Sequence, residues 1–168
     1  SDTLWSNEVR SRDKEYYTIK GGEIFSYEGD VYETECSYIF IRKGSLIGYS
    51  DKLFKFYEFS LSAGKLAKRE LLADEVSNIF PEFKLIKLSD FSAKTNAYKF
   101  KKKKSQVKIL VLNDKNYDMS GYHFSTNNSR FNKYTLNNAI DITKAGMIQL
   151  SQDCENSDLT PWFVLLVR

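Results

Sequence analysis

The residues best suited to chemistry are lysines and aromatics that alternate past the middle of the chain. Basic groups between aromatic rings can follow a phosphate backbone while the rings stack on bases, or can lie against anionic lipid. The candidate binding residues in this segment are Tyr98, Lys99, Lys101, Lys102, Lys103 and Lys104.

The same segment also has a purely structural interpretation. Residues 97–101 and 106–112 fit two strands joined by a lysine-rich loop, where lysines discourage edge-to-edge association of sheets. The run contains no Arg, whose guanidinium gives bidentate contacts to phosphate. The sequence therefore favours a solvated hairpin tip and keeps a nucleic acid or anionic surface as the alternative.

His123 is the only histidine and the one weak catalytic candidate. It could act as the general acid or base of a metal-independent ribonuclease. Such a reaction needs a second proton carrier, and the sequence near His123 offers none. Alternation along a strand places His123 and Ser125 on the face opposite Tyr122, Phe124 and Thr126, so we expect His123 to face solvent.

Glu33 and Glu35 are a second candidate binding pair. In the strand predicted over residues 31–42 they are two positions apart, so they share a face and could bind a cation or a basic partner. A solvated strand face is the more common reason for such a pair. The lone histidine and the cysteine positions give no metal-binding spacing, and we find no Gly-rich phosphate loop, so we predict neither metal nor cofactor.

The net charge is unevenly distributed along the chain. The 168 residues include 25 basic and 22 acidic side chains, for a formal charge of +3. Residues 84–115 contain ten lysines and two aspartates, a net charge of +8, which leaves −5 for the remainder. This separation of a basic segment from a net acidic remainder suits recognition of a partner better than it suits catalysis.

The spacing of apolar residues predicts a mainly β protein. We expect a single domain over residues 1–168, built as an antiparallel sandwich or partly open barrel of about ten short strands, with an α+β fold as the second choice. One helix is predicted near 72–80, where Leu72, Val76 and Ile79 follow a helical period and Pro81 ends it. Residues 65–71 fit either an earlier start of that helix or a strand after a turn. Residues 53–61, rich in aromatics, fit a strand buried on both faces.

The cysteines and the chain ends bear on cellular location. Cys36 and Cys154 could form a disulfide in an exported protein, or could be two reduced thiols that pack as small apolar side chains. The sequence opens at Ser1 rather than Met, which suggests removal of a signal peptide, an upstream domain or a tag. We expect a periplasmic or secreted protein rather than a cytoplasmic one. No apolar run reaches the roughly 18 residues of a membrane helix.

These observations favour a non-catalytic interaction domain, because residues suited to catalysis are scarce and the sequence contains no metal or nucleotide motif. We expect a bacterial protein that recognises another protein or a surface ligand, such as an exported binding protein or an immunity-type inhibitor. The alternative is a nucleic-acid-acting protein that binds through Lys99–Lys104 and reacts through His123.

Overall fold

The computed structural model describes residues 8–10, 16–20, 22–26, 29–62, 64–92, 94–100, 108–126, 133–136, 140–141, 146–152 and 164–167. Contacts divide the chain into two compact units. Unit 1 comprises Ser1–Ser50 and Lys55–Ile79, and unit 2 comprises Asp51–Phe54 and Phe80–Arg168. The single domain expected over residues 1–168 stays a prediction.

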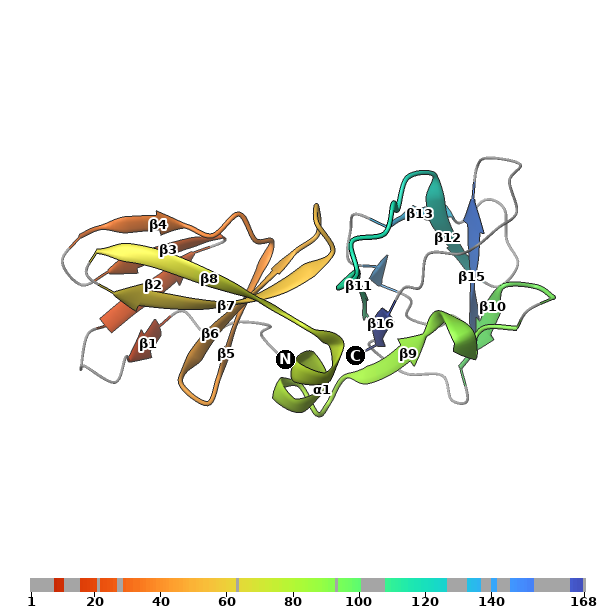
Figure 1. Cartoon of the computed structure of the whole chain (residues 1–168), viewed down its shortest axis with the longest axis horizontal. Helices are drawn as coiled ribbons and strands as arrows, with labels where there is room; N and C mark the ends of the chain where they lie inside the picture. The colour runs from red at the N-terminus through yellow and green to blue at the C-terminus, as the bar shows by residue number, and fades with distance from the viewer. Residues whose placement is uncertain are drawn as a thin grey trace. The chain divides into compact units, whose positions relative to one another are not determined.

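Unit 1 contains two four-stranded antiparallel sheets in which each strand pairs with the next along the chain (Figure 1). Short turns make this meander arrangement the simplest way to pair consecutive strands. The first sheet consists of β1 (Glu8–Arg10), β2 (Tyr16–Lys20), β3 (Glu23–Ser26) and β4 (Val31–Glu33). The second consists of β5 (Tyr38–Arg42), β6 (Ser45–Ser50), β7 (Lys55–Ser62) and β8 (Lys65–Leu71).

Strand β7 has buried aromatic residues on both faces, as the sequence predicts. Tyr57 and Phe59 belong to a core cluster with Cys36, whereas Phe56, on the opposite face, is also fully buried. Gly48 on the neighbouring strand makes room for this packing, since a Cβ there would lie 2.5 Å from the Phe59 ring and 2.7 Å from the Cys36 sulfur.

The predicted helix is confirmed as α1 (Ala73–Ile79). It begins where the Leu72 carbonyl accepts the Val76 N–H, and Pro81 follows its end. Leu72 itself is 54% exposed, because it precedes the helix and is not on its buried face. Residues 65–71 form strand β8, and Gly64 occupies the preceding turn with a φ of +76°. No helix in the described parts of the chain is long and apolar enough to cross a membrane.

The single strand expected over residues 31–42 is wrong. Strand β4 ends at Glu33, and β5 begins at Tyr38 in a different sheet. The break follows Thr34, whose backbone N–H donates to the Gly22 carbonyl at 2.8 Å in continuation of the β3–β4 register and whose hydroxyl donates to the same carbonyl at 2.7 Å. The Thr34 hydroxyl oxygen also accepts the Cys36 N–H, and Glu35 between them has a left-handed φ of 58°.

Unit 2 also contains two four-stranded antiparallel sheets, ordered β10-β15-β12-β13 and β14-β11-β16-β9. Their apolar side chains form one core cluster that includes Ile109, Phe124, Leu150 and Leu165. The strands are β9 (Lys84–Lys87), β10 (Ala97–Lys99), β11 (Lys108–Leu112), β12 (Tyr122–Thr126), β13 (Lys133–Thr135), β14 (Ile140–Asp141), β15 (Met147–Gln152) and β16 (Val164–Val167). A short 3-10 helix, η1 (Leu88–Asp90), follows β9.

The hairpin expected between residues 97–101 and 106–112 is also wrong. Strand β10 pairs with β15, whereas β11 pairs with β14 and β16 in the other sheet. Burial explains the pairing of β11, because Ile109, Leu110 and Val111 are all buried and require a neighbour on each side.

The fold class is confirmed: the chain is mainly β, with antiparallel sheets and, among the described residues, one α-helix. The described residues form sixteen strands rather than about ten. Part of the difference arises because residues 31–42 form two strands, β4 and β5, and because Glu8–Arg10 forms β1.

Candidate anion-binding surface

The structure separates the predicted site residues into three places. Tyr98 and Lys99 lie in β10, His123 lies in β12, and both strands belong to one sheet of unit 2. Glu33 and Glu35 belong to unit 1. The remaining candidates, Lys101, Lys102, Lys103 and Lys104, lie outside the described residues.

Two edge strands of unit 2 meet at a lysine and an aromatic ring. Strand β9 is an edge strand of one sheet and β10 is an edge strand of the other. The Lys84 ammonium on β9 lies 5.6 Å from the centre of the Tyr98 ring on β10. A cation at this distance from a ring face is attracted by the ring quadrupole. We call the exposed lysines along this boundary the basic edge: Lys84, Lys87, Lys94 and Lys99.

Neighbouring rings hold Tyr98 in place. The ring centre of Phe91 lies 5.8 Å from that of Tyr98, and Phe100 approaches at 5.4 Å with its ring nearly perpendicular. Phe91 is buried, and the Phe100 N–H donates to the Gly146 carbonyl, which extends the pairing of β10 with β15. Tyr98 is therefore a partly exposed ring on a supported strand.

The positive charge of the basic edge is not neutralised by carboxylates in the described parts of the chain. None of its four lysines forms an ion pair there. Asp90, three residues after Lys87, accepts the backbone N–H of Lys87 at 2.9 Å and so caps the start of η1. The edge therefore presents uncompensated positive charge to an incoming ligand.

Strand alternation places Lys99 on the opposite face of the sheet from Tyr98. Cross-strand register puts Ala97, Gln149 and Ser125 in one row and Ser151, His123 and Thr135 in the next. We call this side of the sheet the polar face, defined by Lys99, His123, Thr135, Gln149 and Ser151. Ser125 lies within it but is only 7% exposed. The described residues of the polar face include no carboxylate.

His123 lies on the side of β12 that the predicted alternation assigns to it. Tyr122 and Phe124 belong to the core cluster, and His123 lies on the other side of β12, partly buried between Thr135 and Ser151. Burial, and then the charge of Asp118, raises the pKa of Tyr122, so its phenol keeps its proton at neutral pH.

Lys99 and His123 do not meet as an acid–base pair. They are two strands apart, and the register offsets them by four residues of β15. With strands about 4.8 Å apart and a rise of about 3.3 Å per residue, their backbones are about 16 Å apart. Lys99 and His123 could therefore contact an extended ligand only at two separate points.

Glu33 and Glu35 do not share a strand face, contrary to the prediction, because β4 ends at Glu33. Both are exposed, and the register places Glu33 directly opposite Glu23, a like-charge pairing that disfavours the sheet. Within the described residues, no group of three acidic, histidine or cysteine side chains could hold a metal ion. Binding of a basic partner at Glu33 and Glu35 stays a prediction.

Sequence reasoning missed Lys84, Lys87 and Lys94 as members of a site. The only signal was the net charge of +8 over residues 84–115, which counts them without placing them beside Tyr98. Cys36 is buried in the unit 1 core, and Cys154 lies outside the described residues, so the two alternatives for the cysteines stay open.

Comparison of the chain with protein-family models, curated proteins and solved structures gives no match. The functional argument therefore depends on the residues and their placement.

Proposed function

We propose that this chain is a non-catalytic binding domain and that the basic edge recognises an anionic partner. The observation that supports this most directly is the presence of four exposed lysines on the edge strands β9 and β10 and in the segment that connects them, with no ion pair among the described residues. An acidic protein surface and a nucleic acid both satisfy this chemistry.

The electrostatics of the basic edge favour binding. Because its lysines are exposed and form no ion pair with a described carboxylate, an approaching anion displaces water and counterions without breaking an ion pair among the described residues. Clustered charge of one sign also attracts opposite charge over roughly a Debye length, about 8–10 Å at physiological salt. Binding of this kind is fast and weakens steeply as salt is added.

The residues around His123 support binding rather than catalysis. General acid–base chemistry needs a second group that exchanges a proton near neutral pH, and the cross-strand neighbours of His123 are the hydroxyl residues Thr135 and Ser151. Hydroxyl, amide and imidazole groups instead form hydrogen bonds to an anionic ligand.

Retention on immobilised heparin, a repeating polyanion, tests this proposal. The test variant replaces Lys84, Lys87, Lys94 and Lys99 with Gln. A control variant makes the same charge change at Lys43, Lys52, Lys65 and Lys68, which are also exposed. We expect the wild-type and control chains to be retained at low salt, with the test variant eluting at a clearly lower salt concentration.

Two results would overturn the proposal. The first is no retention of the wild-type chain at low ionic strength, where phosphate-like contacts are strongest. The second is an equal loss of retention in both variants, which would assign binding to net charge and not to the basic edge.

A further inference from the structure

We infer that the anionic partner is a single-stranded nucleic acid and that Tyr98 is the ring on which one of its bases stacks. This inference rests on the proposed function of the basic edge and adds the class of ligand. The observation behind it is that the aromatic ring of Tyr98 lies beside Lys84 of the basic edge. Binding of a polyanion without bases would not require such a ring.

The Tyr98 ring has the surroundings of a stacking platform. It packs in part against the core cluster of unit 2, it is held by Phe91 and Phe100, and it is partly exposed with the Lys84 ammonium over the ring, 5.6 Å from its centre. A base that takes the place of this ammonium on the ring leaves Lys84 beside the adjoining phosphate. Stacking of this kind accepts any base, because every base has a flat π face.

The cations of the edge can contact the phosphates of a nucleic-acid backbone. All four are lysines, which act as point charges toward phosphate and do not require one fixed orientation of the ligand. The adjoining polar face supplies Thr135, Ser151 and His123, residue types that contact phosphate and sugar in nucleic-acid complexes. Contacts of these kinds position a strand without reading its sequence.

The ring also favours a single strand over a duplex. In a duplex the base faces are stacked on one another, so a ring on a sheet edge can reach a base only if the base is unstacked at a cost of a few kcal/mol. A single strand exposes its bases already and can lie along β10.

Fluorescence anisotropy with two probes tests the inference. The probes are a labelled oligothymidylate of 20 nucleotides and labelled heparin, which has negative charges but no bases. The variants are Tyr98→Leu, which removes the ring but retains apolar bulk against the core, and Tyr98→Phe, which retains the ring. Thermal unfolding followed by circular dichroism checks that both variants fold.

We expect Tyr98→Leu to bind the oligonucleotide roughly 5- to 100-fold more weakly than wild type, the range given by loss of one stacked base. Its heparin affinity should stay near wild type, and Tyr98→Phe should resemble wild type with both probes. An unlabelled duplex of the same length should compete less well than the single strand.

Four results would overturn the inference. If heparin binds but the oligonucleotide does not, or if Tyr98→Leu weakens both probes alike, the stacking role is wrong while the basic edge keeps its proposed function. If a labelled polyglutamate binds more tightly than the oligonucleotide, the partner is an acidic protein. Binding of none of these probes would remove the proposed function as well.

Discussion

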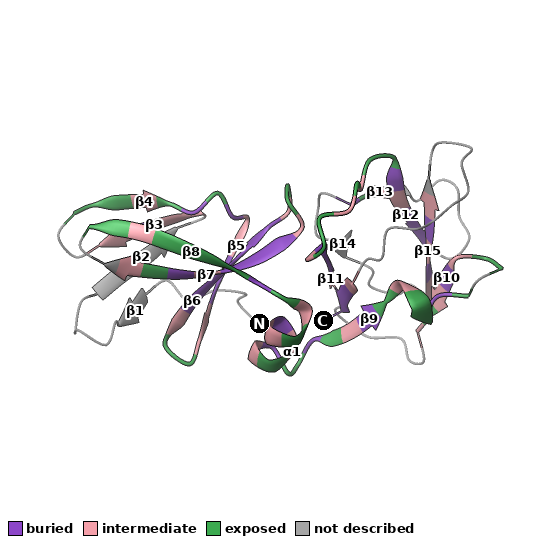
Figure 2. Ribbon diagram, viewed as in Figure 1, coloured by how far each residue is buried: buried purple, intermediate pink, exposed green. Residues whose placement is uncertain are grey.

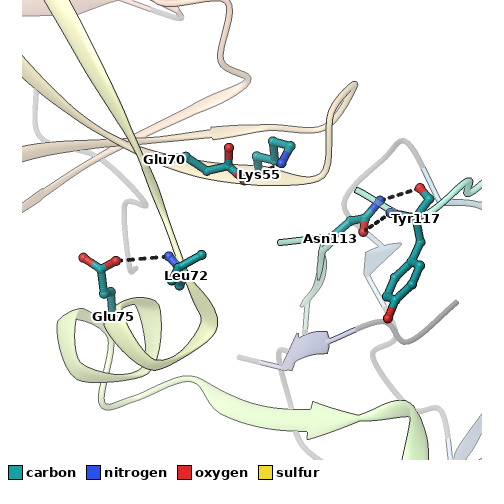
Figure 3. Close-up of polar contacts among 6 residues, drawn as sticks. All are labelled: Lys55, Glu70, Leu72, Glu75, Asn113 and Tyr117. Atoms are coloured by element: carbon teal, nitrogen blue, oxygen red, sulfur yellow. Dashed lines mark hydrogen bonds and ion pairs between the residues drawn. The ribbon is translucent and has the colours of Figure 1, made fainter. Parts of the chain in front are cut away.

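At the scale of single residues, the Asn113 side chain holds a turn of unit 2 through two hydrogen bonds to one backbone residue. It is buried, and its amide donates to the Tyr117 carbonyl at 2.8 Å while accepting the Tyr117 N–H at 3.0 Å (Figure 3). Its own backbone N–H donates to the Phe54 carbonyl at 2.7 Å. One residue thereby closes the turn after β11 and secures the neighbouring segment Asp51–Phe54.

Replacement of Asn113 by Ala should destabilise the protein by about 1–3 kcal/mol, because it leaves two backbone groups of Tyr117 without their partners. Urea unfolding followed by circular dichroism measures the effect. Asn78→Ala is the control, since Asn78 is an exposed residue of α1. A loss at Asn113 no larger than at Asn78 would show that the turn does not depend on this amide.

At the scale of elements, charged side chains connect β7, β8 and α1 within unit 1. Lys55, whose side chain is only 10% exposed, pairs with Glu70 across the two strands (Figure 3). Arg69 on β8 contacts Glu75 of α1 at 2.6 Å and Glu58 of β7 at 3.4 Å. Strand β8 is the edge strand of its sheet and Figure 2 shows that most of it is exposed, so Arg69 and Glu70 also discourage pairing with other chains.

Glu75 makes this connection sensitive to acid. The hydrogen bond from Arg69, and then that from the Leu72 backbone N–H, lowers the pKa of Glu75. A carboxyl group whose pKa is lower in the folded state stabilises the fold above its unfolded pKa of about 4.3, and this stabilisation is lost as the pH falls through the folded value.

The Glu75→Gln variant should therefore lose less thermal stability than wild type between about pH 5 and pH 3, and should be slightly less stable than wild type at pH 7. Melting temperatures by circular dichroism across this range test the prediction. Asp74→Asn is the matched control, because it removes a neighbouring carboxylate of the same helical turn. Equal flattening of both pH profiles would assign the effect to the helix terminus and not to Arg69.

At the scale of the whole molecule, the uneven charge of the sequence falls within one unit. Residues 84–115, with a net charge of +8, lie entirely in unit 2. The folded chain therefore concentrates its positive charge on the unit that contains Tyr98 and the polar face. A ligand that neutralises this charge should release counterions as it binds.

The salt dependence of oligonucleotide binding measures how many phosphates the chain contacts. With the four lysines of the basic edge engaged, the slope of log affinity against log salt should be about −3, at about −0.7 per phosphate for a single strand. Lys99→Gln should reduce the magnitude of the slope by about 0.7. Lys65→Gln, a matched change in unit 1, should leave it unchanged, and an equal change in both variants would argue against the basic edge.

The sequence by itself determined the features that depend on near neighbours. These are the mainly β composition, the helix before Pro81, the burial of both faces of β7 and the alternation around His123. Each follows from a period of two or about 3.6 residues, or from a residue that cannot continue a helix. The excess of positive charge in one segment was likewise visible in the sequence.

Only the tertiary structure decided which strands pair and which side chains meet. The Thr34 side chain before the break is bonded to a carbonyl twelve residues away in Gly22, and the ring of Tyr98 meets Lys84 from another sheet. Gly48 is required by Cys36 and Phe59 from two other segments. Such contacts arise from the joint packing of distant strands, whose register no local pattern specifies.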